Sequence, residues 1–179
     1  DRLAQLCGIP RHHAISAPDL SSAYQVPVTF EKESFGKKVL ASFGLKPRRT
    51  DMRAWRNLNR KIGRLKKSVR IGMIGKYFET GDFTLADSYI SVIEAIKHAG
   101  WASDHQIEFV WLNASEYEND PKKLKQLSSY DGCVVPGGFG SRGIEGLILA
   151  IRYIREYHNP FLGLCYGMQL ACIEFARSK

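Results

Sequence analysis

The sequence predicts an α/β fold built on a doubly wound, mostly parallel sheet. From Val69 onward, short apolar segments alternate with segments of helical period, a pattern typical of parallel strands joined by covering helices. Hydrophobic residues make up 44% of the 179 residues, which is enough for a packed core. No apolar run reaches the roughly 18 residues of a membrane-spanning helix, and no signal-peptide pattern opens the chain.

The strands and helices of this sheet follow in order along the chain. Strands are expected at residues 69–74, 107–112, 132–135 and 161–164. Helices are expected at residues 85–99, 144–157 and 168–177, with a loop between the first strand and the first helix. Asp120 and Pro121 have the chemistry of an N-cap and a first-turn proline, so a further short helix begins there.

The net charge is concentrated in one segment. The chain carries 26 Lys or Arg against 18 Asp or Glu, a net of +8. Residues 37–70 hold 13 of these basic residues and a single acid, Asp51, so the remainder is slightly acidic. Nucleic-acid binding through this segment stays an alternative, but a solvated linker or helix face is the favoured interpretation. Trp55, Leu58, Ile62 and Leu65 are spaced by three and four, which predicts an amphipathic helix whose apolar stripe packs on the body of the protein.

Three regions follow from these patterns. Residues 1–36 have short apolar runs broken by prolines and too little apolar surface to fold alone. Residues 37–68 form the basic stretch, and residues 69–179 form the α/β region. Because the sequence opens at Asp1 without an initiator Met, we expect a fragment of a longer protein. Four cysteines without a CxxC pair or zinc-like spacing predict a reduced, cytoplasmic protein.

The segment from Gly163 to Gln169 predicts a nucleophilic cysteine. Gly163-Leu164-Cys165-Tyr166-Gly167 lies between an apolar strand and a helix, which is the nucleophile-elbow arrangement with sulfur in place of oxygen. The sharp turn requires small neighbours, and Gly163 and Gly167 provide them. Cys165 would stand at a helix N-terminus, where free N–H groups stabilise negative charge. A buried core cysteine is the alternative.

A second turn, Pro136-Gly137-Gly138-Phe139-Gly140, follows the neighbouring strand and falls at the same edge of the sheet. Attack on an amide creates an oxyanion that needs N–H donors already in place. The N–H of Tyr166 is one natural donor, and the Gly137-Gly138 turn supplies another.

These two segments, PGGFGSRGIEG and PFLGLCYGMQLA, resemble the class I (triad-type) glutamine amidotransferases, and most closely the glutaminase domain of the CTP synthase family. Residues 6–27 are similar to the closing segment of that family's synthetase (amidoligase) domain. The resemblance implies a flavodoxin-like fold that is incomplete at its C-terminal end, with residues 37–68 as the interdomain linker.

The resemblance also implies roles for individual residues. Cys165 matches the glutaminase nucleophile, and Gly137 with Tyr166 would form the oxyanion hole. The glutamine-binding positions that the resemblance implies are Gly138, Tyr166, Gly167, Met168 and Gln169. The positions of a lid loop that responds to GTP are Phe139, Gly140, Arg142 and Glu145. Two positions near the nucleotide sites of the other domain are Arg2 (pyrimidine nucleotide) and Leu20 (ATP adenine).

For the parent protein, the resemblance implies a ligase that hydrolyses glutamine and passes ammonia to a second site. There ATP with Mg²⁺ phosphorylates UTP, and ammonia displaces the phosphate to give CTP. GTP would act as an allosteric activator, and the parent would form a homo-oligomer, as a tetramer. No metal site is expected in this chain, and neither nucleic acid nor a membrane is an expected partner.

Two features of the sequence differ from the family pattern. Tyr166 stands where many members have leucine, and the loop at residues 79–86 is longer than usual. A third feature concerns activity: the family places a His, supported by a Glu, after the cysteine, and no His follows Cys165 here. We therefore expect no glutaminase turnover from the chain alone. A truncated, non-catalytic module that binds or regulates a full-length partner remains an alternative, as does another amidotransferase such as a GMP synthase glutaminase.

Overall fold

The computed structural model describes residues 2–75, 79–80, 83–84, 89–138, 140 and 143–179. The chain divides into two compact units, Asp1–Arg64 and Leu65–Lys179. All of the net charge lies in the first unit, which holds 13 basic and 5 acidic residues, whereas the second holds 13 of each.

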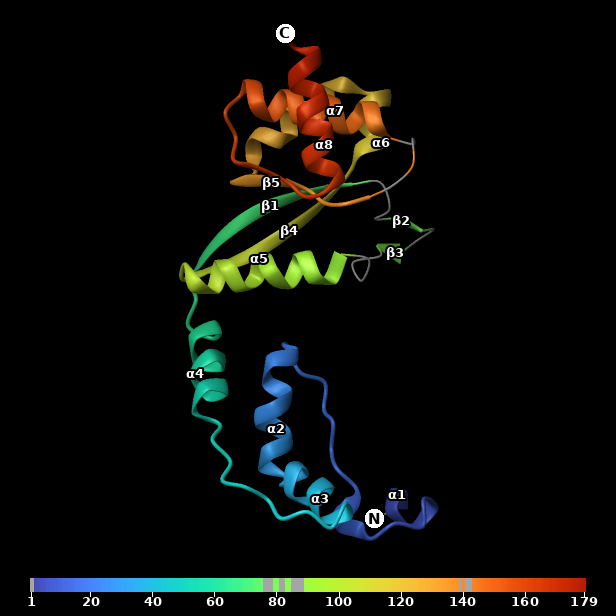
Figure 1. Cartoon of the computed structure of the whole chain (residues 1–179), viewed down its shortest axis with the longest axis vertical. Helices are drawn as coiled ribbons and strands as arrows, with labels where there is room; N and C mark the ends of the chain where they lie inside the picture. Colours follow the sequence, from blue (N-terminus) through green and yellow to red (C-terminus); the bar gives the residue numbers. More distant parts are fainter. Residues whose placement is uncertain (1, 76–78, 81–82, 85–88, 139, 141–142) are drawn as a thin grey trace. The chain divides into compact units, whose positions relative to one another are not determined.

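The first unit consists of short helices (Figure 1). In chain order they are α1 (Arg2–Leu6), η1 (Arg11–His13), η2 (Ala23–Gln25), α2 (Val26–Lys32), α3 (Phe35–Ser42) and α4 (Arg53–Ile62).

Apolar and polar contacts between these helices hold the first unit together. The rings of Tyr24 and Trp55 lie 6.4 Å apart, and the side chain of Asn59 donates a hydrogen bond to the carbonyl oxygen of Tyr24 at 3.0 Å. The apolar stripe of α4 therefore contacts η2 inside its own unit, and Leu65 lies beyond the helix. Among the described residues of this unit only Ala4 is buried, so the unit has almost no core.

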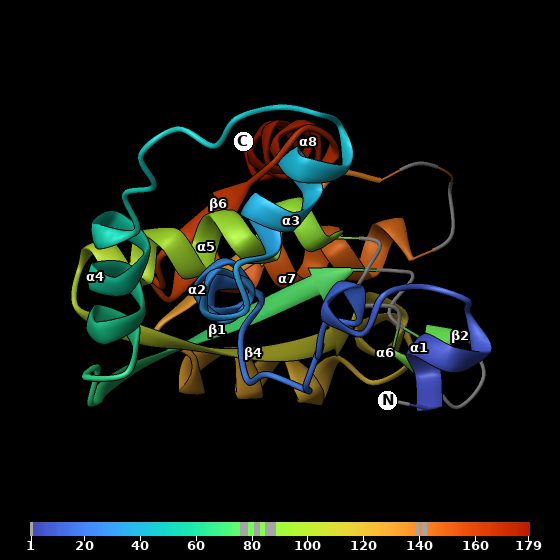
Figure 2. The same cartoon turned by 90° about the horizontal axis from the view of Figure 1, so that it is seen from below.

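The second unit is a parallel sheet with helices on both faces (Figure 1). Its strands are β1 (Lys67–Gly75), β4 (His105–Asn113), β5 (Gly132–Val135) and β6 (Phe161–Gly163), in the spatial order β4-β1-β5-β6. Its helices are α5 (Ile90–Ala102), α6 (Ala114–Asn119), η4 (Pro121–Ser129), α7 (Ile144–Glu156) and α8 (Tyr166–Arg177). β1 and β4 lie side by side from Lys67↔His105 to Gly75↔Asn113 (Figure 2).

Side chains of successive residues on the strands point to opposite faces, and each face has its own core. On one face, Ile74 and Val135 pack with residues of α6, η4, α7 and α8. On the other face, Met73 and Val134 pack with α5. Among the helices of the second unit, Figure 1 shows α5 on one side of the sheet and α6, α7 and α8 on the other. The predicted doubly wound α/β architecture is confirmed.

The predicted strands and helices of the second unit are present, with most ends within about two residues of the prediction. The first helix differs more: it was expected at residues 85–99, and α5 spans Ile90–Ala102, with residues 85–88 outside the described residues.

The structure differs from the prediction at three further places. The predicted loop between the first strand and the first helix contains an antiparallel pair, β2 (Glu79–Thr80) and β3 (Phe83–Thr84); residues 81–82 and 85–86 of the long loop lie outside the described residues. The sequence pattern did not predict α6, which begins with the side chain of Asn113 accepting a hydrogen bond from the Ser115 N–H. Helix α8 begins at Tyr166, two residues before its predicted start. The Asp120 N-cap is confirmed by the hydrogen bond that its side chain accepts from the Lys122 N–H.

In the part of the chain that the structure describes, no helix combines the length and the apolar character needed to cross a membrane.

Candidate active site

Cys165 occupies a strained turn between β6 and α8. Its backbone angles are φ 51° and ψ −104°, a region that residues with a side chain rarely adopt. It is the N-cap residue of α8, and its side chain is exposed. The turn is closed by the Gly167 N–H, which donates to the Leu164 carbonyl oxygen at 2.9 Å, and by the Gln169 N–H, which donates to that of Cys165 at 3.1 Å. The geometry is that of a nucleophile elbow, and a thiol at its tip is accessible to substrate.

The two glycines of the elbow are required by space. A Cβ added at Gly163 would lie 2.7 Å from the carbonyl carbon of Gly167, and one added at Gly167 would lie 2.1 Å from the carbonyl oxygen of Val135. Both neighbours are backbone atoms, which cannot rotate away. The Leu164 N–H also donates to the Val135 carbonyl oxygen at 2.9 Å, so the turn is held tightly against β5.

The two glycine-bearing turns meet at one edge of the sheet. A Cβ built on Gly137 would lie 3.5 Å from the Cβ of Cys165, so the Gly137 backbone lies against the side chain of the cysteine. The Tyr166 hydroxyl donates to the carbonyl oxygen of Gly140 at 3.4 Å. This side-chain contact was not foreseen from the sequence, where only the backbone of Tyr166 had a role.

The remaining glutamine-binding candidates surround this turn. Gly138 has open space where a side chain would be, with no atom within 4 Å of an added Cβ, and Gly167 is buried. Met168 and Gln169, in the first turn of α8, are exposed. Met168 and Gly163 also line an open, apolar groove of about 450 Å³ beside β6 and α8. No charged side chain lines this groove, so it is unsuited to the charged ends of free glutamine.

The lid positions are described only in part. Gly140 and Gly143 have positive φ, and Glu145 lies in the first turn of α7, where Arg177 of α8 pairs with it at 2.9 Å. Phe139 and Arg142 lie outside the described residues. A response of this loop to GTP stays a prediction.

Histidines of the second unit lie away from Cys165. His105 begins β4 and His158 precedes β6, so both are at the amino ends of the strands, opposite to Cys165. His98 lies on α5 with its ring 5.3 Å from that of Trp101. His12 and His13 belong to η1 of the first unit. The structure therefore brings no histidine of the second unit to the thiol.

The two weak nucleotide candidates both belong to the first unit. Arg2 is exposed at the start of α1, and Leu20 is half-buried ahead of η2. Their assignment to nucleotide sites stays a prediction. No group of three or more His, Cys, Asp or Glu side chains that could hold a metal ion occurs among the described residues.

Cys133, which lies in the sheet, differs from the candidate nucleophile Cys165 in its burial. Cys133 lies inside the core on β5, where desolvation raises the pKa of its thiol to about 12. It is thus a neutral core residue, as most buried cysteines are, whereas Cys165 is exposed.

The chain is similar to known proteins. The family model described as glutamine amidotransferase class I matches residues 84–178. CTP synthase of Streptococcus equi subsp. zooepidemicus is 44% identical over 177 residues, covering 99% of this chain and 32% of that protein. CTP synthase of Bacillus subtilis is 41% identical over 179 residues, with the same coverage.

A solved structure is similar to part of the chain. The glutaminase domain of a Trypanosoma brucei CTPS with bound acivicin superposes with a TM-score of 0.55 at 35% identity. The similarity covers 62% of this chain and 41% of that one. The present chain thus spans about a third of the length of the curated relatives that it matches.

Proposed function

This chain belongs to the class I glutamine amidotransferases, and from that premise we propose that Cys165 is the nucleophile that attacks the side-chain amide of glutamine. One observation carries the proposal: an exposed cysteine at φ 51° on a strand-to-helix turn, with the Gly137 backbone against its Cβ. A strained, accessible thiol beside a glycine backbone suits attack on an amide, because the developing oxyanion can approach backbone N–H groups closely.

The chemistry assigns each group a role. The Cys165 sulfur adds to the amide carbon, and the carbonyl oxygen becomes an oxyanion held by N–H groups of Gly137 and Tyr166. When the tetrahedral intermediate collapses, the C–N bond breaks, the nitrogen takes a proton and leaves as ammonia, and a thioester remains on Cys165. Water then hydrolyses the thioester to glutamate. Gly138, Met168 and Gln169 would contact the substrate around the turn.

The proton transfers need a base and an acid, and no histidine of the second unit lies at the thiol to serve as either. The unit's histidines His98, His105 and His158 lie elsewhere, as described above. We therefore propose that the 179 residues are modified at Cys165 by a reactive glutamine analogue but do not turn glutamine over without a base from outside them.

For the parent protein we propose the activity that its relatives' names state, the synthesis of CTP. Ammonia from glutamine would react with UTP activated by ATP and Mg²⁺, GTP would act through the lid at residues 139–145, and the protein would work in the cytoplasm as a tetramer. Arg2 and Leu20 would lie at the border of the nucleotide sites. The described residues offer no cluster fit to hold Mg²⁺, so no step here is assigned to the metal.

The decisive experiment measures modification of Cys165 by acivicin, the compound bound in the related glutaminase structure. Peptide mass spectrometry should locate the adduct on Cys165 and not on Cys172, which is exposed on the same helix. Free glutamine should slow the reaction, and Cys165→Ala should abolish it. Equal labelling of both cysteines, or no protection by glutamine, would contradict the proposal.

A second candidate function is that of a non-catalytic module that regulates a full-length amidotransferase. It is favoured because no histidine of the second unit lies at the thiol. That function requires a change in the partner's glutaminase rate when the chain is added. It should persist in Cys165→Ala, which separates it from catalysis.

A further inference from the structure

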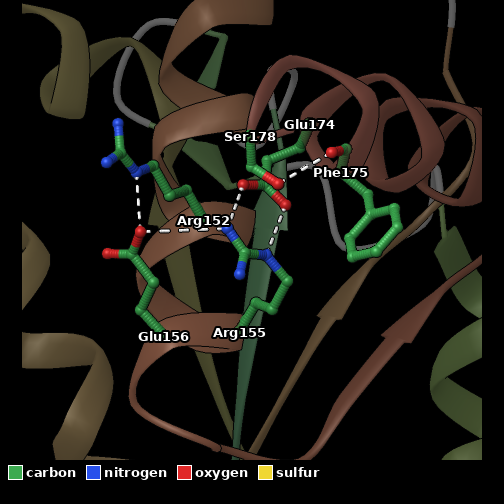
Figure 3. A network of polar contacts seen from close by, with 6 residues as sticks. All are labelled: Arg152, Arg155, Glu156, Glu174, Phe175 and Ser178. Carbon is green, nitrogen blue, oxygen red and sulfur yellow. Dashed lines mark hydrogen bonds and ion pairs between the residues drawn. The ribbon is translucent and has the colours of Figure 1, made fainter.

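One ion pair between the helices of the second unit differs from the others by its burial. Glu174 on α8 is 2% exposed and is the one buried charged side chain among the described residues. Both of its oxygens accept from Arg155 on α7, at 2.8 Å from Nε and 2.7 Å from a terminal nitrogen (Figure 3). A bidentate guanidinium–carboxylate pair fixes direction as well as distance, since two parallel hydrogen bonds define a plane.

The neighbouring ion pairs are exposed. Glu156 pairs with Arg152 at 2.8 Å and, more distantly, with Arg155 at 3.8 Å, all within α7. Arg177 pairs with Glu145 at 2.9 Å between α8 and α7. They border, with Glu174, an open groove of about 500 Å³ between the two helices. Exposed pairs contribute little because water competes for both partners, whereas a buried carboxylate has no other partner to turn to.

Helix α8 links the buried pair to the nucleophile. Cys165 is the N-cap of α8, and Glu174 lies nine residues later (174 − 165). At 1.5 Å per residue these positions are about 13.5 Å apart along a rigid rod, so a tilt of about 10° at one end moves the other by roughly 2.4 Å. Catalytic groups tolerate a displacement of only about 0.5 Å.

The N-terminal end of α8 has tight contacts with the sheet, so it cannot shift to compensate for a tilt of the helix. Gly167 lies directly against the Val135 carbonyl oxygen, and Cys165 is about 3 Å from it along the helix axis. A rotation of α8 by about 10° about this contact therefore moves Cys165 by about 0.5 Å relative to Gly137, which is the limit of that tolerance. Arg155, in the last turn of α7, holds the other end. Besides the apolar packing of Leu170 in the core, α8 is thus held by the glycine contact with β5 near one end and by the pair of Glu174 with Arg155 toward the other.

We propose that Glu174 is a positioning residue: through Arg155 it fixes the direction of α8 and so holds Cys165 and Tyr166 against the backbone of Gly137. The role rests on the proposed function, because it concerns the geometry of that site. This positioning role differs from a contribution to the free energy of unfolding alone, because the pair sets the direction of one helix.

The test compares Glu174→Gln with the control Glu108→Gln, which makes the same change at an exposed carboxylate on β4 that pairs with Arg70 and not with Arg155. Three cysteines of the chain serve as reporters in one sample. Acivicin measures the site at Cys165, iodoacetamide measures general access to α8 at Cys172, and iodoacetamide at the buried Cys133 measures opening of the core.

Glu174→Gln should slow acivicin modification of Cys165 by at least about tenfold, since a displacement of about 1 Å costs on the order of 100-fold. In Glu174→Gln, labelling of Cys172 should stay within about twofold of the wild-type rate, and labelling of Cys133 should stay as slow as in the wild type. Glu108→Gln should leave all three rates unchanged. Unchanged Cys165 labelling in Glu174→Gln, or an equal fall in both variants, would overturn the proposal. A fall accompanied by fast labelling of Cys133 would also overturn it, because the residue would then serve the fold alone.

If Glu174→Gln does not fold, Arg155→Lys decides in its place. It keeps the charge but loses the bidentate geometry, so the same pattern of three rates is expected. Failure of the proposed function is distinguishable: acivicin would then not select Cys165 in the wild-type chain. The iodoacetamide rate of Cys165 relative to Cys172 would still report whether Glu174 positions the turn.

Discussion

Replacing Gly167 by alanine should destabilise the protein, although a glycine-to-alanine change inside a helix normally stabilises it. Gly167 is the second residue of α8, and glycine-to-alanine changes inside helices normally stabilise by about 1 kcal/mol. Here the added Cβ would lie 2.1 Å from the Val135 carbonyl oxygen and 2.9 Å from the carbonyl carbon. Backbone atoms at these distances cannot be avoided by a rotamer change, so α8 must move away from β5.

The magnitude follows from the contacts that this movement breaks. Overpacking against a rigid neighbour costs about 1–3 kcal/mol. The hydrogen bonds from Leu164 to Val135 and from Gly167 to Leu164, both 2.9 Å, are strained or lost at about 1 kcal/mol each. After the gain in helix propensity is subtracted, we expect Gly167→Ala to lower the free energy of unfolding by roughly 2–4 kcal/mol.

Urea denaturation followed by tryptophan fluorescence measures this value, because Trp101 is buried in the same unit. Ala171→Gly in the middle of α8 is the control, with an expected loss of about 1–2 kcal/mol from helix propensity and from its partly buried methyl group. If propensity decided both positions, the two variants would shift the midpoint in opposite directions. A Gly167→Ala protein as stable as the wild type, with unchanged labelling of Cys165, would refute the steric reasoning.

Three further predictions concern the same unit. The pKa of the buried Cys133 thiol is raised from 9.0 to about 12, so the folded state keeps a proton that the unfolded chain loses. The protonated thiol therefore makes its full contribution to the free energy of unfolding below pH 9, and this contribution falls by about 1.4 kcal/mol per pH unit between pH 9 and about 12. Urea titrations at several pH values measure this slope, which Cys133→Ala should flatten. Glu118→Ala removes the carboxylate that accepts a 3.0 Å hydrogen bond from the Gly146 N–H at the start of α7, and should cost about 1 kcal/mol in thermal unfolding. Arg152→Ala breaks an exposed pair and should change stability by less than about 0.5 kcal/mol, and a larger loss would show that the pair is shielded from water.

The sequence predicted the sheet because its strands are short and apolar and end at turn residues. Residues 132–135 were assigned correctly at both ends, since Asp131 precedes the strand, Gly132 begins it and Pro136 follows it. Helix α6 escaped prediction because its six residues include polar side chains and are too short to show a helical period. It is set by the Asn113 cap and by packing: an added Cβ at Gly146 would lie within 2 Å of the Ala114 carbonyl oxygen.

The candidate site, like the fold, has some features that the sequence predicted and others that it did not. The elbow was predictable because its constraint is local: a nucleophile on a tight turn needs glycine on both sides, and Gly163 and Gly167 lie two residues from Cys165. The contact of the Tyr166 hydroxyl with Gly140 spans 26 residues, and the pair of Arg155 with Glu174 spans 19. No spacing rule links such positions, because their meeting depends on how α7 and α8 pack on the sheet.

The backbone angles of Cys165 carry a consequence for engineering. Holding a residue with a side chain at φ 51° costs on the order of 1–3 kcal/mol, and glycine would avoid most of that cost. Selection for heat resistance alone would therefore favour Cys165→Gly, a more stable molecule that lacks the thiol of the candidate site. A thermostability screen on this chain needs a parallel readout of the sulfur, or its best-scoring variants will be chemically inert.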